Sequence, residues 1–241
     1  MKILVLQHAD VEHPGSLRAM LEDDGHAWTP VHLNQGEKIP SIDGFDALWV
    51  LGGPMDTWQE DLHPWLVEEK AFIRDCVAEK GVPYLGLCLG HQLLADALGG
   101  AVEPSQTPEI GVLPVQLTEV GATGVLFDGL PETFNTLQWH SAEVTRMPEG
   151  ARCLATSPDC AVQAMAWQTR AFSFQFHLEV EPDTFDNWVE IPEYAAALDK
   201  ALGTEGAAKM RQECSDTVQD FEKLAERVYI NWLQATSNTS A

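Results

Sequence analysis

The stretch that decides the fold reads GLCLGHQLLADALGG and occupies residues 86–100. It continues the apolar run 84–87, which predicts a buried strand, and its leucines and alanines then recur at helical spacing until Gly99 and Gly100 stop the pattern. The sequence therefore predicts a strand, a sharp turn and a helix, with Cys88 at the junction.

Cys88 lies between Gly86 and Gly90, in a G-x-nucleophile-x-G arrangement. Such an elbow strains its central residue, and flanking side chains would collide with the turn or the substrate, so both flanks need glycine. The positive end of the following helix also favours a thiolate. We interpret Cys88 as a nucleophile, although the pentapeptide alone also fits a buried structural cysteine.

A second candidate stretch is FSFQFHLE at residues 172–179. Its three phenylalanines alternate onto one face of a strand, which places His177 and Glu179 together on the other. A cysteine nucleophile needs a base, and the base gains from a third group that orients it and stabilises its protonated form. We predict these roles for His177 and Glu179, although each alone also fits a structural histidine or a solvated acid.

Amide hydrolysis also needs donors for the developing oxyanion, and two backbone N–H groups are candidates. One belongs to Gly53, in the glycine-rich turn that follows the apolar run 47–51, and the other to Leu89. The Gly-Gly-Pro turn alone also fits a loop that needs permissive dihedral angles. His91 lies in the first turn of the predicted helix, and we interpret it as structural.

The rest of the chain predicts an α/β protein. Apolar runs alternate with helical patterns over the first hundred residues, as in βαβ units with a parallel sheet, and the middle of the chain predicts an antiparallel or mixed extension. The predicted strands are 3–6, 47–51, 84–87, 112–117, 133–139, 161–167 and 171–176, and the predicted helices are 17–24, 64–80, 89–98, 182–189, 194–202 and 210–232. Residues 235–241 predict a frayed tail. We expect one domain over 1–241, with a helical extension from about 190.

Composition excludes several classes of function. The formal net charge of −23 would repel phosphate backbones and acidic membrane surfaces, so we expect neither nucleic acid nor a membrane as partner. The five cysteines fit neither a disulfide framework nor a zinc cluster, and Cys76 and Cys214 fall on predicted core faces. Without a signal peptide or a long apolar run, the sequence predicts a cytoplasmic protein.

Three motifs together resemble those of the class I (triad-type) glutamine amidotransferases: GGPM at 52–55, the stretch 86–100, and FQFHLEVEP at 174–182. The sequence is most similar to freestanding members that resemble the amidotransferase part of GMP synthetase. The resemblance implies a flavodoxin-like open mixed sheet flanked by helices, and glutamine hydrolysis through a thioester on Cys88. It requires no cofactor or metal.

The resemblance also implies substrate contacts. By motif position, Gln92 should contact the glutamyl group, and the backbone of Ser141 and Ala142 should contact the α-amino-acid end. This chain departs from the family at Leu178, where proline is usual and where its loss could loosen the turn that aims the acid, and at Ala142, where aspartate is common. We interpret the neighbouring His140 as structural or pocket-lining.

Several functions stay open at this stage. The chain could supply ammonia from glutamine to a separate synthase subunit, or it could act alone on other γ-glutamyl amides or peptides. A catalytically silent binding module and a cysteine peptidase on a similar sheet are weaker alternatives. The acidic residues Asp56, Glu60 and Asp61, with His63, do not form a recognisable ligand pattern, so we predict no metal.

Overall fold

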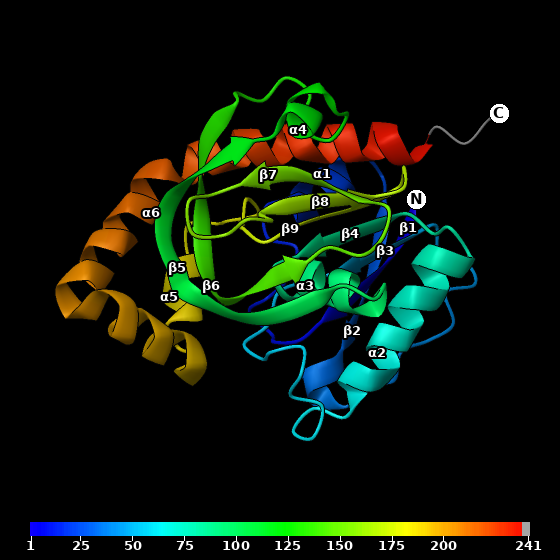
Figure 1. The fold of residues 1–241 in the computed structure, drawn as a ribbon, viewed down its shortest axis with the longest axis horizontal. Helices are drawn as coiled ribbons and strands as arrows, with labels where there is room; N and C mark the ends of the chain where they lie inside the picture. The colour runs from blue at the N-terminus through cyan, green and yellow to red at the C-terminus, as the bar shows by residue number, and fades with distance from the viewer. Residues whose placement is uncertain (238–241) are drawn as a thin grey trace.

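The computed structural model describes residues 1–237 as a nine-stranded sheet with helices on both faces (Figure 1). The strands are β1 (Lys2–Gln7), β2 (Ala27–His32), β3 (Ala47–Val50), β4 (Tyr84–Leu87), β5 (Ala101–Leu117), β6 (Thr133–Arg146), β7 (Ala151–Thr156), β8 (Ala164–Trp167) and β9 (Ala171–Phe174). The α-helices are α1 (Leu17–Asp23), α2 (Trp65–Arg74), α3 (Leu89–Ala97), α4 (Glu119–Thr123), α5 (Thr184–Trp188) and α6 (Pro192–Ser237). A 3₁₀ turn covers Leu33–Gln35, and a π-helical turn covers Asp75–Glu79.

The sheet has the strand order β2-β1-β3-β4-β9-β8-β7-β5-β6. Its first five strands are parallel and the others are antiparallel. The parallel part has the 2-1-3-4-5 order of flavodoxin-like sheets, in which ligands bind at the carboxyl ends of the strands. The predicted α/β class, with a flavodoxin-like open mixed sheet flanked by helices, is confirmed. The ends of β3, β4 and β9 are therefore the place to look for a site.

Two apolar cores cover the two faces of the parallel strands. On one face α1 and the last part of α6 pack against Val5, Trp49 and Phe174, and on the other α2 and α3 pack against Leu4 and Val50. Figure 1 shows the red end of α6 beside α1, with α2 in cyan lying apart from both. Alternate strand residues thus serve opposite cores, because successive side chains of a strand point to opposite faces.

The predicted elements of the parallel half are confirmed, and those of the antiparallel half only in part. The long strand β5 was expected only over 112–117, because Pro104, Pro108 and Gly111 argue against a strand. The register of its pairing with β6 shifts between Pro104 and Glu109, and this irregularity accommodates the prolines. Strands β2 and β7 were not predicted; β2 is a largely exposed edge strand interrupted by Pro30, so its sequence carries little strand pattern.

Helix α6 contains both predicted C-terminal helices. They meet at Gly203, whose φ of 63° and ψ of −177° break the helix, and a substituent there would contact nothing within 4 Å. The expected frayed tail is wrong for 235–237, where the helix continues and Thr236 is buried; residues 238–241 lie outside the described residues. None of the helices formed by residues 1–237 combines the length and hydropathy needed to cross a membrane.

Trp232, near the end of α6, tests whether this helix belongs to the same folding unit as the sheet. Its ring is fully buried, packs edge-on against Trp49 at 5.3 Å and donates its N–H to Tyr84 O at 3.1 Å. We expect Trp232→Ala to lower the free energy of unfolding by about 3–5 kcal/mol in urea denaturation. Trp58→Ala, at a side chain that is 43% exposed, should change it by less than about 0.5 kcal/mol. An unchanged urea midpoint for Trp232→Ala would contradict a single unit.

Candidate active site

Cys88 occupies a strained turn between β4 and α3. Its φ of 49° and ψ of −103° are unusual for a residue with a side chain. A Cβ on Gly86 would lie 2.6 Å from Gly90 O, and one on Gly90 would lie 2.0 Å from Val50 O. The prediction that both flanks need glycine is confirmed. The Cys88 N–H donates to Phe174 O at 2.9 Å, so the elbow is tied to the end of β9.

His177 and Glu179 follow β9 and lie beside the elbow. His177 exchanges two backbone hydrogen bonds with Leu137 of β6, at 2.8 and 3.2 Å, which hold its main chain in place. Its Nδ1 lies 2.6 Å from Glu179 Oε1. Its Nε2 is buried without a hydrogen-bond partner among residues 1–237, and Cys88 lies near enough to raise the pKa of the imidazole. The three predicted catalytic residues therefore meet.

The pKa of His177 lies well above its ordinary value. Burial alone would lower it, but the charge of Glu179, the nearby thiol of Cys88 and the hydrogen bond to Glu179 outweigh burial and favour the imidazolium. An imidazolium beside a cysteine stabilises the thiolate, which is the attacking form. The arrangement can therefore form a nucleophile and hold a proton for a leaving group.

Leu178 supplies a contact that proline could not make at this position. Its backbone N–H donates to Glu179 Oε2 at 2.9 Å, while Oε1 of the same carboxylate bonds to His177. Both oxygens of Glu179 are thus fixed. The N–H that proline lacks therefore aims the carboxylate directly, which opposes the loosening that the loss of proline could cause.

The two predicted oxyanion donors lie on either side of the nucleophile. Gly53 follows β3, Leu89 begins α3, and both line one cavity with Cys88. Within residues 1–237 neither N–H donates to another group of the chain. The two positions are in close contact, since a Cβ on Gly53 would lie 3.0 Å from Leu89 Cδ2. The turn thus presents two available donors beside the thiol.

The cavity at Cys88 has a volume of about 130 Å³. Its lining includes the predicted substrate contacts Gln92, Ser141 and Ala142, and also His140, which confirms the pocket-lining interpretation of that histidine. Gln92 is more constrained than expected, because its Nε2 already donates to Ala142 O at 3.2 Å and to Gln175 Oε1 at 3.0 Å. Only its carbonyl oxygen remains for a ligand.

Three further residues reach the site without having been predicted. Gln175 donates to the sulfur of Cys88 at 3.5 Å. Tyr194 of α6 lines the cavity and donates to the buried carboxylate of Glu12. Gln175 could have been found, because it shares a strand face with His177. Glu12 and Tyr194 are 182 residues apart, and no local pattern marks either of them.

Buried side chains near the pocket take structural roles. His91 is fully buried, bonds to Ser173 Oγ at 2.9 Å and to Val162 O at 3.1 Å, and burial lowers its pKa to about 3. It stays neutral at physiological pH, which supports its structural interpretation. Cys76 and Cys214 are core residues as predicted, and burial raises the pKa of each thiol to about 12.

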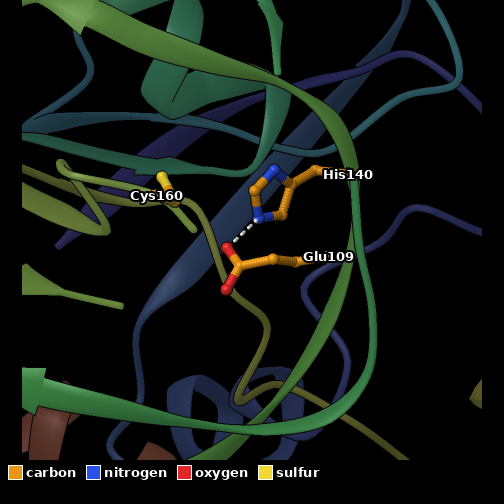
Figure 2. A group of neighbouring side chains, drawn as sticks. All are labelled: Glu109, His140 and Cys160. Atoms are coloured by element: carbon orange, nitrogen blue, oxygen red, sulfur yellow. Dashed lines mark hydrogen bonds and ion pairs between the residues drawn. The ribbon is translucent and has the colours of Figure 1, made fainter. Parts of the chain in front are cut away.

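Glu109, His140 and Cys160 form the one group among residues 1–237 whose chemistry and spacing could hold a metal ion (Figure 2). Their ligand atoms lie within 4.8 Å of one another and all three residues are buried. The group is already satisfied internally, since Glu109 Oε2 lies 3.1 Å from His140 Nε2 and accepts from Gln163 at 2.6 Å. Burial raises the pKa of Cys160 to about 12, so the thiol would have to lose a tightly held proton to bind an ion.

Comparison with known proteins connects this geometry to a family. The sequence model of the family described as "Glutamine amidotransferase class-I" matches residues 16–190. The chain is 32% identical to a glutamine-hydrolyzing GMP synthase subunit of Sulfolobus acidocaldarius, over 67% of this chain and 84% of that protein. It is 30% identical to the putative glutamine amidotransferase-like protein YfeJ of Salmonella typhimurium, over 79% of this chain and 80% of that protein.

A solved structure extends the similarity to the whole described fold. A glutamine amidotransferase of Methylobacillus flagellatus superposes with a TM-score of 0.86 at 26% identity, over 97% of this chain and 94% of that one. The chain also matches full-length GMP synthases, but it spans only 29% of one and 33% of another. The chain therefore corresponds to only a part of those longer proteins.

Glu179→Gln tests whether the acid controls the charge of His177. Loss of the carboxylate removes the charge that raises the pKa of His177, so the imidazolium should titrate away at a lower pH. The imidazolium supports the Cys88 thiolate. Alkylation of Cys88 by iodoacetamide at pH 7 should therefore slow about tenfold for each unit by which the pKa of His177 falls. Alkylation of the parent protein and of Glu179→Gln is followed by mass spectrometry from pH 5 to 9, with Cys88→Ser as the blank. Superimposable pH profiles of the two proteins would contradict this role of Glu179.

The purified protein should carry only substoichiometric zinc. Because Glu109, His140 and Gln163 satisfy one another, a chelator should leave the melting temperature unchanged. Elemental analysis together with thermal denaturation tests this expectation. One metal per chain, lost in Cys160→Ser, would show that the group is a metal site.

Proposed function

Because the chain belongs to the class I glutamine amidotransferase family, we propose that it hydrolyses the side-chain amide of glutamine through a thioester on Cys88. One observation carries the proposal. A strained cysteine lies near His177, whose Nε2 is buried without a hydrogen-bond partner among residues 1–237 and whose Nδ1 is bonded to Glu179 at 2.6 Å. Nucleophile, base and orienting acid thus stand in the order that covalent amide hydrolysis requires.

The reaction follows from these positions. The Cys88 thiolate attacks the side-chain carbonyl carbon, and the displaced electron pair moves to the carbonyl oxygen, where the N–H groups of Gly53 and Leu89 bind it. When the carbon–nitrogen bond breaks, His177 gives its Nε2 proton to the departing ammonia. His177 then takes a proton from water, which attacks the thioester and releases glutamate and the thiolate. Glu179 stabilises the imidazolium and needs no proton of its own.

Substrate binding involves further residues that line the cavity at Cys88. We assign the glutamyl group to Gln92, through its free carbonyl oxygen, and the α-amino-acid end to the backbone of Ser141 and Ala142. Gln175 stabilises the sulfur through its N–H contact at 3.5 Å. Binding therefore relies on neutral and backbone groups, which is typical of sites that fix orientation with a few polar contacts.

The ammonia acceptor separates two forms of this function. The relative from Sulfolobus acidocaldarius, which is named as one subunit of GMP synthase, favours a chain that supplies ammonia to a separate synthase.

The alternative is a freestanding hydrolase of γ-glutamyl amides or peptides, and one observation favours it. Glu193, Tyr194 and Ala197, which lie beyond the family match at 16–190, line the cavity and provide a wall from the chain itself. A silent binding module is disfavoured by the complete triad geometry.

The reaction needs no cofactor, and we place it in the cytoplasm. All five cysteines are free, and a reducing compartment keeps thiols in that form. The strong negative charge leaves no reason to invoke a nucleic acid or an acidic membrane as partner.

Product release from the purified chain, without any added protein, tests the proposal. Glutamine and a panel of γ-glutamyl amides and peptides should include at least one substrate whose hydrolysis falls by about a thousandfold or more in Cys88→Ala. Cys214→Ala, which removes a buried thiol far along α6, is the matched control and should keep its rate. Fast cleavage of a substituted amide would establish a freestanding hydrolase. Turnover that survives Cys88→Ala would exclude the thioester route.

A further inference from the structure

A buried ion pair lies directly behind the Gly52–Gly53 turn. His8 follows β1 and Glu69 lies in α2, and their side chains are 0% exposed, with His8 Nε2 2.9 Å from Glu69 Oε1. The other ring nitrogen, Nδ1, lies 2.9 Å from Gly52 O. Trp65 stacks on the imidazole with ring centroids 5.5 Å apart. The pair thus connects α2, through one histidine, to the turn beside Cys88.

The partners of His8 determine where its protons are. A backbone carbonyl can only accept, so Nδ1 must carry a proton and donate it to Gly52 O. Nε2 shares a second proton with the carboxylate of Glu69. Burial alone would lower the pKa of His8, but the charge and hydrogen bond of Glu69, with the Gly52 carbonyl and the charge of Glu12, outweigh it and raise the pKa. The donor to Gly52 O is therefore a charge-assisted one.

Gly52 O and Gly53 N–H belong to the same peptide group. A trans peptide is planar, so its C=O and N–H bonds point in opposite directions. A donor that holds the oxygen on one side thereby aims the N–H on the other, where the cavity at Cys88 lies. The same bond pulls electron density toward the oxygen and strengthens the N–H as a donor, because hydrogen bonds in a chain polarise one another.

Close packing keeps this peptide from rotating away. A Cβ on Gly53 would lie 2.7 Å from His8 Cβ and 2.8 Å from Met55 Sδ. A Cβ on Gly52 would lie 2.5 Å from the carboxylate of Glu12. The turn is therefore closely packed, against His8 and Met55 at Gly53 and against Glu12 at Gly52. His8 is the side chain that bonds to the Gly52 carbonyl.

We propose that His8, held by Glu69, is a positioning residue of the oxyanion site: its Nδ1–H fixes and polarises the Gly52–Gly53 peptide so that the Gly53 N–H meets the charge that forms on the substrate oxygen. The proposal rests on the proposed function, because it assigns the Gly53 N–H to the transition state of that reaction. His8 does not touch the substrate. Its effect should appear in kcat and little in KM, since the oxyanion exists only after attack.

A purely structural pair is the competing explanation, since His8 and Glu69 also join β1 to α2. The test therefore compares two variants that lose the ion pair equally. Both carry Glu69→Gln, so that no unpaired carboxylate stays buried. One adds His8→Asn, whose amide nitrogen can take the place of Nδ1, and the other adds His8→Leu, which is close to asparagine in shape but has no donor.

We expect His8→Asn with Glu69→Gln to keep kcat within about fivefold of Glu69→Gln alone. His8→Leu with Glu69→Gln should lower kcat by a further factor of about 10 to 100 at nearly constant KM. This reduction is somewhat smaller than the one expected when an oxyanion donor is removed altogether. Alkylation of Cys88 by iodoacetamide, which forms no oxyanion, should proceed at the same rate in both. Thermal denaturation is measured alongside to compare their folding.

Equal kcat values for the asparagine and leucine variants would overturn the proposal, and so would a parallel loss of alkylation. If the leucine variant does not fold, the asparagine variant is judged against Glu69→Gln alone, and a hundredfold loss in kcat despite the retained donor would also overturn it. Failure of the proposed function is separate, because the parent protein would then show no hydrolysis that depends on Cys88. In that case the assignment of His8 falls with it.

Discussion

The structure depends on how closely the elbow at Cys88 approaches the end of β3. Gly90 donates to Leu51 O at 3.1 Å, and a single added Cβ there would lie 2.0 Å from Val50 O. This contact brings the start of α3 against the turn that follows the neighbouring parallel strand. Only backbone can fill the space between them, so main-chain packing brings the elbow against the turn that carries Gly53.

Around this contact, two buried imidazoles support the site. His177 lies near the thiol and its Nδ1 is bonded to Glu179, while His8 bonds to the Gly52 carbonyl through Nδ1 and to Glu69 through Nε2. In both pairs the pKa of the histidine is raised by a buried carboxylate despite the cost of burial. Both pairs thus favour positive charge near the place where negative charge develops, within a protein whose net charge is −23.

The sequence predicted the local features of this site well and its long-range contacts poorly. The elbow, the parallel strands and the alternation that brings His177 beside Glu179 all follow from periodicity and glycine spacing, so they could be derived from short windows. Strand β5 was underestimated because its prolines are tolerated only through pairing with β6. The contact of Tyr194 with Glu12 and that of His8 with Glu69 join segments 182 and 61 residues apart, and a single sequence holds no record of such pairings.

Helix α6 has a consequence for how the chain is made. Its last turns, with Ala225, Val228, Tyr229 and Trp232, cover one face of the parallel sheet together with α1, and they are synthesised after every strand of that sheet. Strand β9, which lies beside β4 in the middle of the sheet, also appears on the ribosome only after residue 171. An emerging chain therefore exposes apolar sheet surface and an unpaired strand edge until β9 and α6 have been made, and such surfaces bind chaperones and aggregate. Newly made molecules depend on α6 to cover this surface with its last turns, as well as to line the pocket with its first.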